Sequence, residues 1–284
     1  MADPGPGPIA ARGRTTGLAA ALLPTIVVLA LAVVLIVPAV AGGSKSNPRH
    51  REVVLWGLPA ALAVVAAIAR RTAHGPAIFD RRRALRLLPW CAGAFVLDHF
   101  FLYVGHTTGW LTFTFGDQNL SSYVGRTALW ALPACLAAGV IGWEATLRGV
   151  LLGRWTQAAP RGVAVALVCG VGVTLALTAT IGQAGDADPA YLAAAIVSAA
   201  AREAACTAIA LGGGGVLTAG LYRGAHLYLE AFLVSDWYSL FFPAGNYVTS
   251  DPRLYAARAA TAILAAALMV AGARWTGRRS GVER

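Results

Sequence analysis

The sequence predicts an all-α integral membrane protein, a polytopic bundle of about eight transmembrane helices. Of its 284 residues 57% are hydrophobic and only 13% are charged, and the mean hydropathy is +0.63. The apolar residues also fall into runs long enough to cross a bilayer, with basic clusters between them. A soluble domain of this length would carry more charge on its surface, so we expect the bilayer to be the solvent.

Eight apolar runs are predicted to cross the membrane: Gly17–Ala41, Val53–Ala69, Leu87–Gly105, Tyr123–Gly153, Gly162–Ile181, Ala190–Tyr222, Ala225–Ala244 and Leu254–Ala273. They divide the chain into a disordered cytoplasmic N-terminus (1–16), a three-span region (17–121), a core of spans four to seven (122–245), and a last span with a basic cytoplasmic tail (246–284). The sixth run is long for a simple crossing and contains four consecutive glycines, Gly212–Gly215. In lipid such a run more often allows close helix contact than a break.

The basic clusters predict the orientation. The connection Arg70–Arg86 carries six arginines, whereas the loops Thr107–Ser121 and Gly182–Pro189 contain no Lys or Arg. Lys and Arg favour cytoplasmic loops, so we expect a plasma-membrane protein with both termini in the cytoplasm, although Gly42–Glu52 is basic on the expected outer side. The net charge of +10 comes from these short clusters, which indicates membrane lipids as partners and no nucleic acid.

The polar residues inside the apolar runs are the candidates for function. Glu144 and Arg148 lie four residues apart in the fourth run, a spacing that places both side chains on one helical face. A charge at mid-membrane costs about 2.5–3.5 kcal/mol on insertion scales, so we expect this pair to face the protein interior. Arg202 and Glu203 are adjacent, and because they point about 100° apart on a helix they need separate partners.

The segment from Trp143 to Leu152 resembles the signature of the CPBP family of intramembrane proteases, the CAAX prenyl protease and bacteriocin-processing group. The family's first motif is Glu-Glu-x-x-x-Arg followed by glycine, and its second Glu, its Arg and the glycine match Glu144, Arg148 and Gly149. The segment Gly220–Tyr228 weakly resembles the glycine-containing stretch that precedes the family's third motif. The resemblance implies an intramembrane endopeptidase that acts on a membrane-embedded peptide or protein.

This sequence departs from the family's pattern at the positions to which the resemblance assigns water activation. The first Glu is replaced by Trp143, which cannot accept a proton, and there is no histidine between His106 and His226 for the second motif. A rebuilt acid–base site is possible, with Glu144 as base and with Asp98, His99, Glu203 and His226 converging on it inside the bundle. The predicted catalytic residues are Glu144, Arg148, His99 and His226.

The sequence predicts no metal and no cofactor. His-Glu-x-x-His is absent and no two histidines lie at i and i+4, and Gly-x-Ser-x-Gly is absent as well. Three functions stay open: a weak or non-proteolytic CPBP homologue in which Glu144 and Arg148 form a structural ion pair, an active endopeptidase that uses Glu144 with an unconventional histidine, and a small transporter or permease subunit. The transporter alternative needs Glu144, Arg148, Arg202 and Glu203 to line a polar path.

Overall fold

The structure is a computed structural model, and it describes residues 8–41, 56–69, 79–111, 113–115, 131–181, 189–230, 241–243 and 252–282. The predicted loops lie wholly or partly outside these ranges: all of 42–52, residues 70–78 of the second connection, residues 112 and 116–121 of the third, and residues 182–188 fall in the gaps. The first seven residues of the predicted disordered N-terminus also lie outside the described residues.

The described chain is helical almost throughout. The helices are α1 (Pro8–Ala41), α3 (Leu58–Ala69), α4 (Arg81–Asp98), α5 (Phe100–Thr107), the π-helix η3 (Ala138–Leu151), α7 (Leu152–Ala158), α8 (Arg161–Ile181), α9 (Pro189–Ile209), the short π-type segment η4 (Ala210–Gly214), α10 (Gly215–Tyr228) and α11 (Pro252–Val282). Two three-residue strands, β1 (Phe113–Phe115) and β2 (Phe241–Pro243), pair antiparallel at one end of the bundle.

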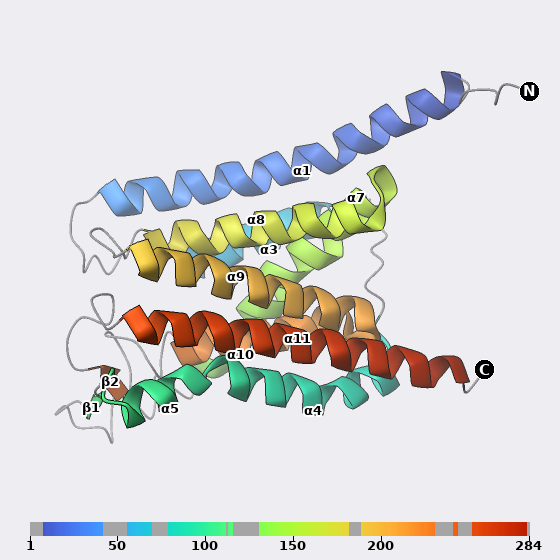
Figure 1. Cartoon of the computed structure of the whole chain (residues 1–284). Helices are drawn as coiled ribbons and strands as arrows, with labels where there is room; N and C mark the ends of the chain where they lie inside the picture. Colours follow the sequence, from blue (N-terminus) through green and yellow to red (C-terminus); the bar gives the residue numbers. More distant parts are fainter. Residues whose placement is uncertain are drawn as a thin grey trace, which may run out of the picture.

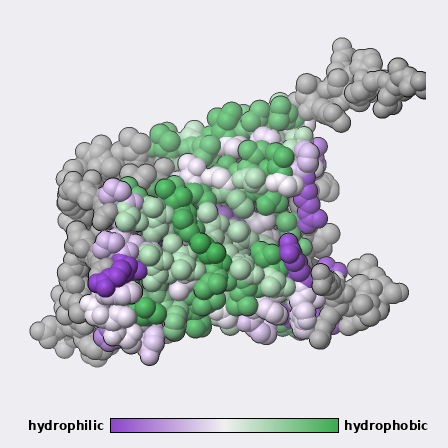
Figure 2. Space-filling model, in the orientation of Figure 1, coloured by the Kyte–Doolittle hydropathy of each residue, from purple (hydrophilic) through white to green (hydrophobic). Residues whose placement is uncertain are grey.

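The all-α membrane bundle predicted from the sequence is confirmed. Five helical stretches in the described residues are long and apolar enough to cross a membrane, and α3 and Arg161–Leu177 of α8 are shorter apolar helices, so the count is lower than the eight expected. The helices lie side by side along one common direction (Figure 1). Figure 2 shows hydrophobic residues across the middle of one face and hydrophilic residues gathered towards its two ends, which is the pattern of a protein that spans a bilayer.

The prediction of a single sixth span is wrong. The segment expected to cross the membrane once, Ala190–Tyr222, contains α9, the glycine run and the start of α10, which ends at Tyr228. Of the predicted seventh span, Ala225–Ala244, residues 231–240 and 244 lie outside the described residues. Arg223 of α10 forms an ion pair with Glu203 of α9, although the two lie on opposite sides of the glycine run. The chain therefore reverses at Gly212–Gly215, and α9 and α10 form an antiparallel helical hairpin.

Glycine is required at the tip of this hairpin. Gly213 has φ +104° and Gly215 has φ +61°, a region that L-residues with a Cβ rarely adopt. A Cβ on Gly213 would also lie 2.5 Å from Cδ of Arg83 at the start of α4. The Gly213 carbonyl accepts a hydrogen bond from the backbone N–H of Asp80, at 2.9 Å, which ties the hairpin tip to α4.

Glycines also bring η3 and α10 into backbone contact. A Cβ on Gly139 would lie 2.3 Å from the Gly220 carbonyl oxygen, and a Cβ on Gly224 would lie 2.6 Å from that of Cys135. This close approach is the small-residue packing typical of membrane helices. It places Glu144 and Arg148 of η3 opposite the polar side chains of the α9–α10 hairpin.

Both ends of the described chain lie at the same end of the bundle (Figure 1). Helix α1 begins at Pro8, inside the segment predicted to be disordered, and α11 runs on to Val282. The core consists of two main apolar clusters. One is formed by α1, α3, η3, α7 and α8, and the other by α4, α9, α10 and α11.

Candidate functional site

Glu144 and Arg148 belong to a closed ring of four charged side chains, which we call the ion-pair ring: Glu144, Arg148, Glu203 and Arg223. Arg148 lies 3.1 Å from Glu144 and 2.6 Å from Glu203. Arg223 lies 2.6 Å from Glu144 and pairs with Glu203 as well. Each carboxylate therefore contacts both guanidinium groups, and each guanidinium contacts both carboxylates.

The ion-pair ring is electrically neutral and almost inaccessible. The side chains of Glu144 and Arg148 are 0% exposed, that of Glu203 is 1% exposed and that of Arg223 is 10% exposed. Removing charges from water is costly, and mutual attraction offsets that cost only when partners and hydrogen bonds are complete. The ring meets the first part of this condition, since two acids are matched by two bases, whereas Oε2 of Glu144 has no hydrogen-bond partner among the described residues.

Arg148 satisfies its remaining donors with Thr207 and with the backbone of α9. Its Nε and Nη2 donate to Oγ1 of Thr207 at 3.3 and 2.9 Å, and Nη2 also donates to the Glu203 carbonyl at 2.7 Å. Thr207 in turn donates to that same carbonyl at 2.8 Å. A planar guanidinium with donors in a fixed fork suits such a set of acceptors better than an ammonium group.

Two neighbours complete the enclosure of the ring. Gly172 of α8 makes room for an acid, since a Cβ there would lie 2.3 Å from Cδ of Glu203. Trp143, which occupies the position of the first motif Glu, is 4% exposed and lies under the guanidinium of Arg223, 5.1 Å from its ring centroid. An indole face attracts a cation, so Trp143 supports the ring where an additional carboxylate would disturb its charge balance.

A second polar group also lies inside the bundle, and we call it the histidine cluster: Asp98, His99 and His226. Asp98 and His226 are each 2% exposed, and the two imidazole rings stack with centroids 4.8 Å apart. The helix breaks at His99, between α4 and α5, and so these neighbouring side chains approach His226 together. Nδ1 of His226 lies 3.4 Å from Oδ2 of Asp98.

Arg202 binds the histidine cluster to a further acid. Its Nε donates to Oδ2 of Asp98 at 3.0 Å, and its other nitrogens donate to both carboxylate oxygens of Glu230. Arg258 of α11 lies 3.8 Å from Glu230. As expected for adjacent residues, Arg202 and Glu203 point to different partners, Arg202 to the histidine cluster and Glu203 to the ion-pair ring.

The structure therefore sorts the predicted site residues into two groups. Glu144, Arg148 and Glu203 come together, whereas His99 and His226 join Asp98 instead of Glu144. Among the described residues, the ion pairs of Glu144 are with Arg148 and Arg223. His226 was expected at the head of a seventh span, and it lies in the last turn of α10, fully inside the bundle.

Sequence analysis missed Arg223, Glu230 and Arg258. Arg223 and His226 are three residues apart, which places them on one helical face, and that spacing could have marked both as inward-facing. The assumed continuous sixth span hid this signal, because Arg223 then fell in a connection between spans.

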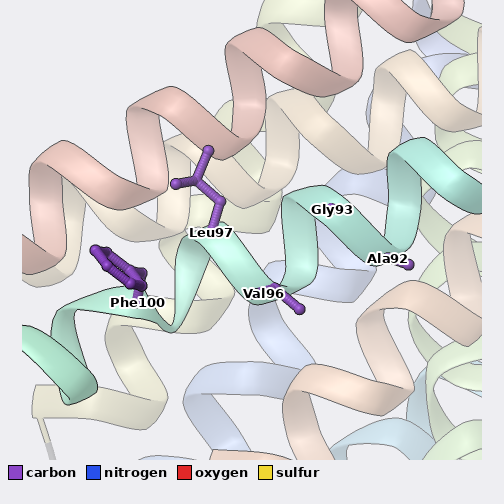
Figure 3. A pocket seen from close by; sticks show the side chains of 5 residues that line it. All are labelled: Ala92, Gly93, Val96, Leu97 and Phe100. Atoms are coloured by element: carbon purple, nitrogen blue, oxygen red, sulfur yellow. The ribbon is translucent and has the colours of Figure 1, made fainter.

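One surface depression in the described part of the chain is apolar. It is lined by Ala92, Gly93, Val96, Leu97 and Phe100 of α4 and α5 (Figure 3). Val96 is 65% exposed and Phe100 is 45% exposed, as expected for side chains that face lipid. The depression shares no residue with the ion-pair ring or the histidine cluster.

No family model, no curated protein and no solved structure matches this chain. Fold and site together define a multi-span membrane protein with a neutral ion-pair ring and a separate histidine cluster in its interior. Any closer assignment has to come from the residues themselves.

Proposed function

We propose that this chain is a non-proteolytic membrane protein similar to the CPBP family, in which the Glu144–Arg148 motif stabilises the bundle instead of hydrolysing peptides. The observation that carries the proposal is the ion-pair ring, in which Glu144 is held by two arginines at 0% exposure. A general base must reach the water it activates. A carboxylate shared between two guanidinium groups and closed off by Trp143 is placed to hold helices together.

One observation favours the alternative of an active endopeptidase. Oε2 of Glu144 is buried and has no hydrogen-bond partner among the described residues, so this oxygen is available to accept a proton. Against it, neither His99 nor His226 contacts Glu144, and both lie with Asp98. The endopeptidase alternative therefore needs a substrate or water that reaches Oε2 without a histidine.

The transporter alternative is not favoured by the contacts. It requires Glu144, Arg148 and Glu203 to line a path, but these side chains are at most 1% exposed and bind one another. A polar path needs groups that exchange partners with a solute, and the ring has its partners already.

The test is the variant Glu144→Gln in the full chain, purified in detergent. Removing one partner of a buried pair costs about 3–5 kcal/mol, so we expect a clear loss of thermal stability. The double variant Glu144→Gln/Arg223→Gln removes one acid and one base, and we expect it to recover part of the stability lost in either single variant.

Activity is measured in parallel on a prenylated CAAX peptide, the substrate class that the resemblance implies. We expect no difference in cleavage between the unmodified chain and Glu144→Gln. Cleavage that is abolished by Glu144→Gln at unchanged thermal stability would overturn the structural role and establish the endopeptidase.

A further inference from the structure

The histidine cluster contains buried polar atoms without partners. Oδ1 of Asp98, Nε2 of His99 and both ring nitrogens of His226 make no hydrogen bond in the described part of the chain. Asp98 and His226 are each only 2% exposed, so bulk water does not satisfy these atoms. Unpartnered buried polar atoms are costly, and in native proteins they commonly mark a bound water or ion.

The three side chains also lie close to one another. One ligand atom from each of Asp98, His99 and His226 lies within 4.8 Å of the others. Zinc binds His nitrogen and carboxylate oxygen at about 2.0–2.2 Å, which puts tetrahedral ligands about 3.4 Å apart. Binding of an ion would therefore draw the three ligand atoms closer together.

In both His99 and Asp98, one polar side-chain atom already has a hydrogen-bond partner. The other polar atom of each side chain is left for a ligand. Nδ1 of His99 lies 2.9 Å from the Phe95 carbonyl, so Nε2 is left for a ligand. Oδ2 of Asp98 accepts from Arg202 at 3.0 Å, so Oδ1 is left. A metal-binding His usually donates its second N–H to a carbonyl or carboxylate, and ligating carboxylates are themselves hydrogen-bonded.

Aromatic side chains hold the rings in place. Phe95 contacts both His99 and His226, with centroids 4.7 and 4.8 Å apart, and Tyr222 packs edge-on against His226 at 4.5 Å. Arg202, which contacts Asp98, is paired with Glu230 as well. This pairing reduces the repulsion that a free guanidinium would exert on a metal ion.

We propose that Asp98, His99 and His226 form a binding site for a divalent first-row transition metal, with Zn²⁺ as the preferred ion. Two imidazoles and one carboxylate are ligands that suit zinc and its neighbours in the series. Three protein ligands leave one coordination position open for water or for a small ligand. The proposal is independent of the role of Glu144 and goes beyond the proposed function.

The experiment uses the full chain in detergent, stripped with a chelator and titrated with Zn²⁺ or with Co²⁺, whose absorption spectrum reports coordination. The variants are His99→Ala and His226→Gln, and the matched control is His106→Ala, which removes an exposed histidine of α5. We expect stoichiometric binding by the unmodified chain and by His106→Ala. Each variant that removes a metal ligand should weaken metal affinity at least about tenfold. Replacing a residue that only hydrogen-bonds to a metal ligand already lowers metal affinity about tenfold.

Thermal unfolding with and without Zn²⁺ gives a second readout. An ion that binds only the folded state raises its apparent stability, so Zn²⁺ should raise the melting temperature of the unmodified chain and of His106→Ala, but not that of His226→Gln. Failure of the stripped chain to bind either ion at micromolar concentration would overturn the proposal, and so would equal Co²⁺ spectra for the unmodified chain and His226→Gln. These results are separate from the stability and cleavage tests on Glu144.

Discussion

Arg148 illustrates how single residues determine the polar interior. Its guanidinium binds two carboxylates, one hydroxyl and one backbone carbonyl, and it is among the largest fully buried side chains of the described chain. The four-residue spacing between Glu144 and Arg148 predicted the ion pair between these two residues. Glu203 and Arg223 are the other two members of the ion-pair ring. No local sequence pattern links them to Arg148, because the turn between α9 and α10 determines where they lie.

Gly172 provides a test of the ring that changes no charge. The variant Gly172→Ala places a methyl group where the carboxylate of Glu203 lies, 2.3 Å from its Cδ. Overpacking of this kind costs about 1–3 kcal/mol, and we expect a lower melting temperature in detergent.

Gly170→Ala is the matched control for this variant, because it lies on the same helix and a Cβ there has no neighbour within 4 Å. Replacing glycine by alanine at an unhindered helical position is worth up to about 1 kcal/mol in favour of alanine. Equal melting temperatures for the two variants would contradict the tight fit of Glu203 against α8.

Helical elements determine which polar side chains meet. The hairpin of α9 and α10 brings Glu203 to Arg223, and it brings Arg202 to Glu230. The break between α4 and α5 at His99 brings Asp98 and His99 to the same side. Both breaks occur inside apolar sequence, where hydropathy alone predicts uninterrupted spans.

The hairpin tip depends on the conformation of Gly213. The variant Gly213→Ala forces a residue with a Cβ to adopt φ +104° against Arg83, and strained backbone of this type costs about 1–3 kcal/mol. We expect reduced thermal stability and faster proteolysis near the tip. Gly162→Ala at the start of α8, where nothing lies within 4 Å of the added Cβ, should neither lower the melting temperature nor speed proteolysis, and similar behaviour of the two variants would argue against a strained turn.

The ion-pair ring connects the two main apolar clusters of the bundle. Glu144 and Arg148 belong to η3 on one side, and Glu203 and Arg223 belong to the hairpin on the other. Composition and hydropathy were sufficient to predict the membrane bundle and the inward-facing pair. The ring and the histidine cluster could not be predicted, because both depend on contacts between helices whose order and turns are set by a few glycines.

The arrangement of the chain ends gives a prediction for the whole molecule. The start of α1 and the end of α11 lie at one end of the bundle and the end of α5 lies at the other (Figure 1). The starts of α4 and α8, with their arginines, lie at the same end as the termini, and such clusters favour the cytoplasm. We therefore expect single cysteines introduced by Arg14→Cys and Arg279→Cys to react with a membrane-impermeant maleimide only after the cells are permeabilised.

Thr108→Cys, just beyond α5, should react in intact cells. The unmodified chain is the background control, since three of its four cysteines, Cys91, Cys135 and Cys206, are buried. Labelling of Arg14→Cys and Arg279→Cys from opposite sides would require an odd number of crossings, which would contradict the reversal at Gly212–Gly215 and with it the approach of Arg223 to Glu203. Labelling of Arg14→Cys and Arg279→Cys in intact cells, with Thr108→Cys labelled only after permeabilisation, would instead retain the fold and reverse only its orientation in the membrane.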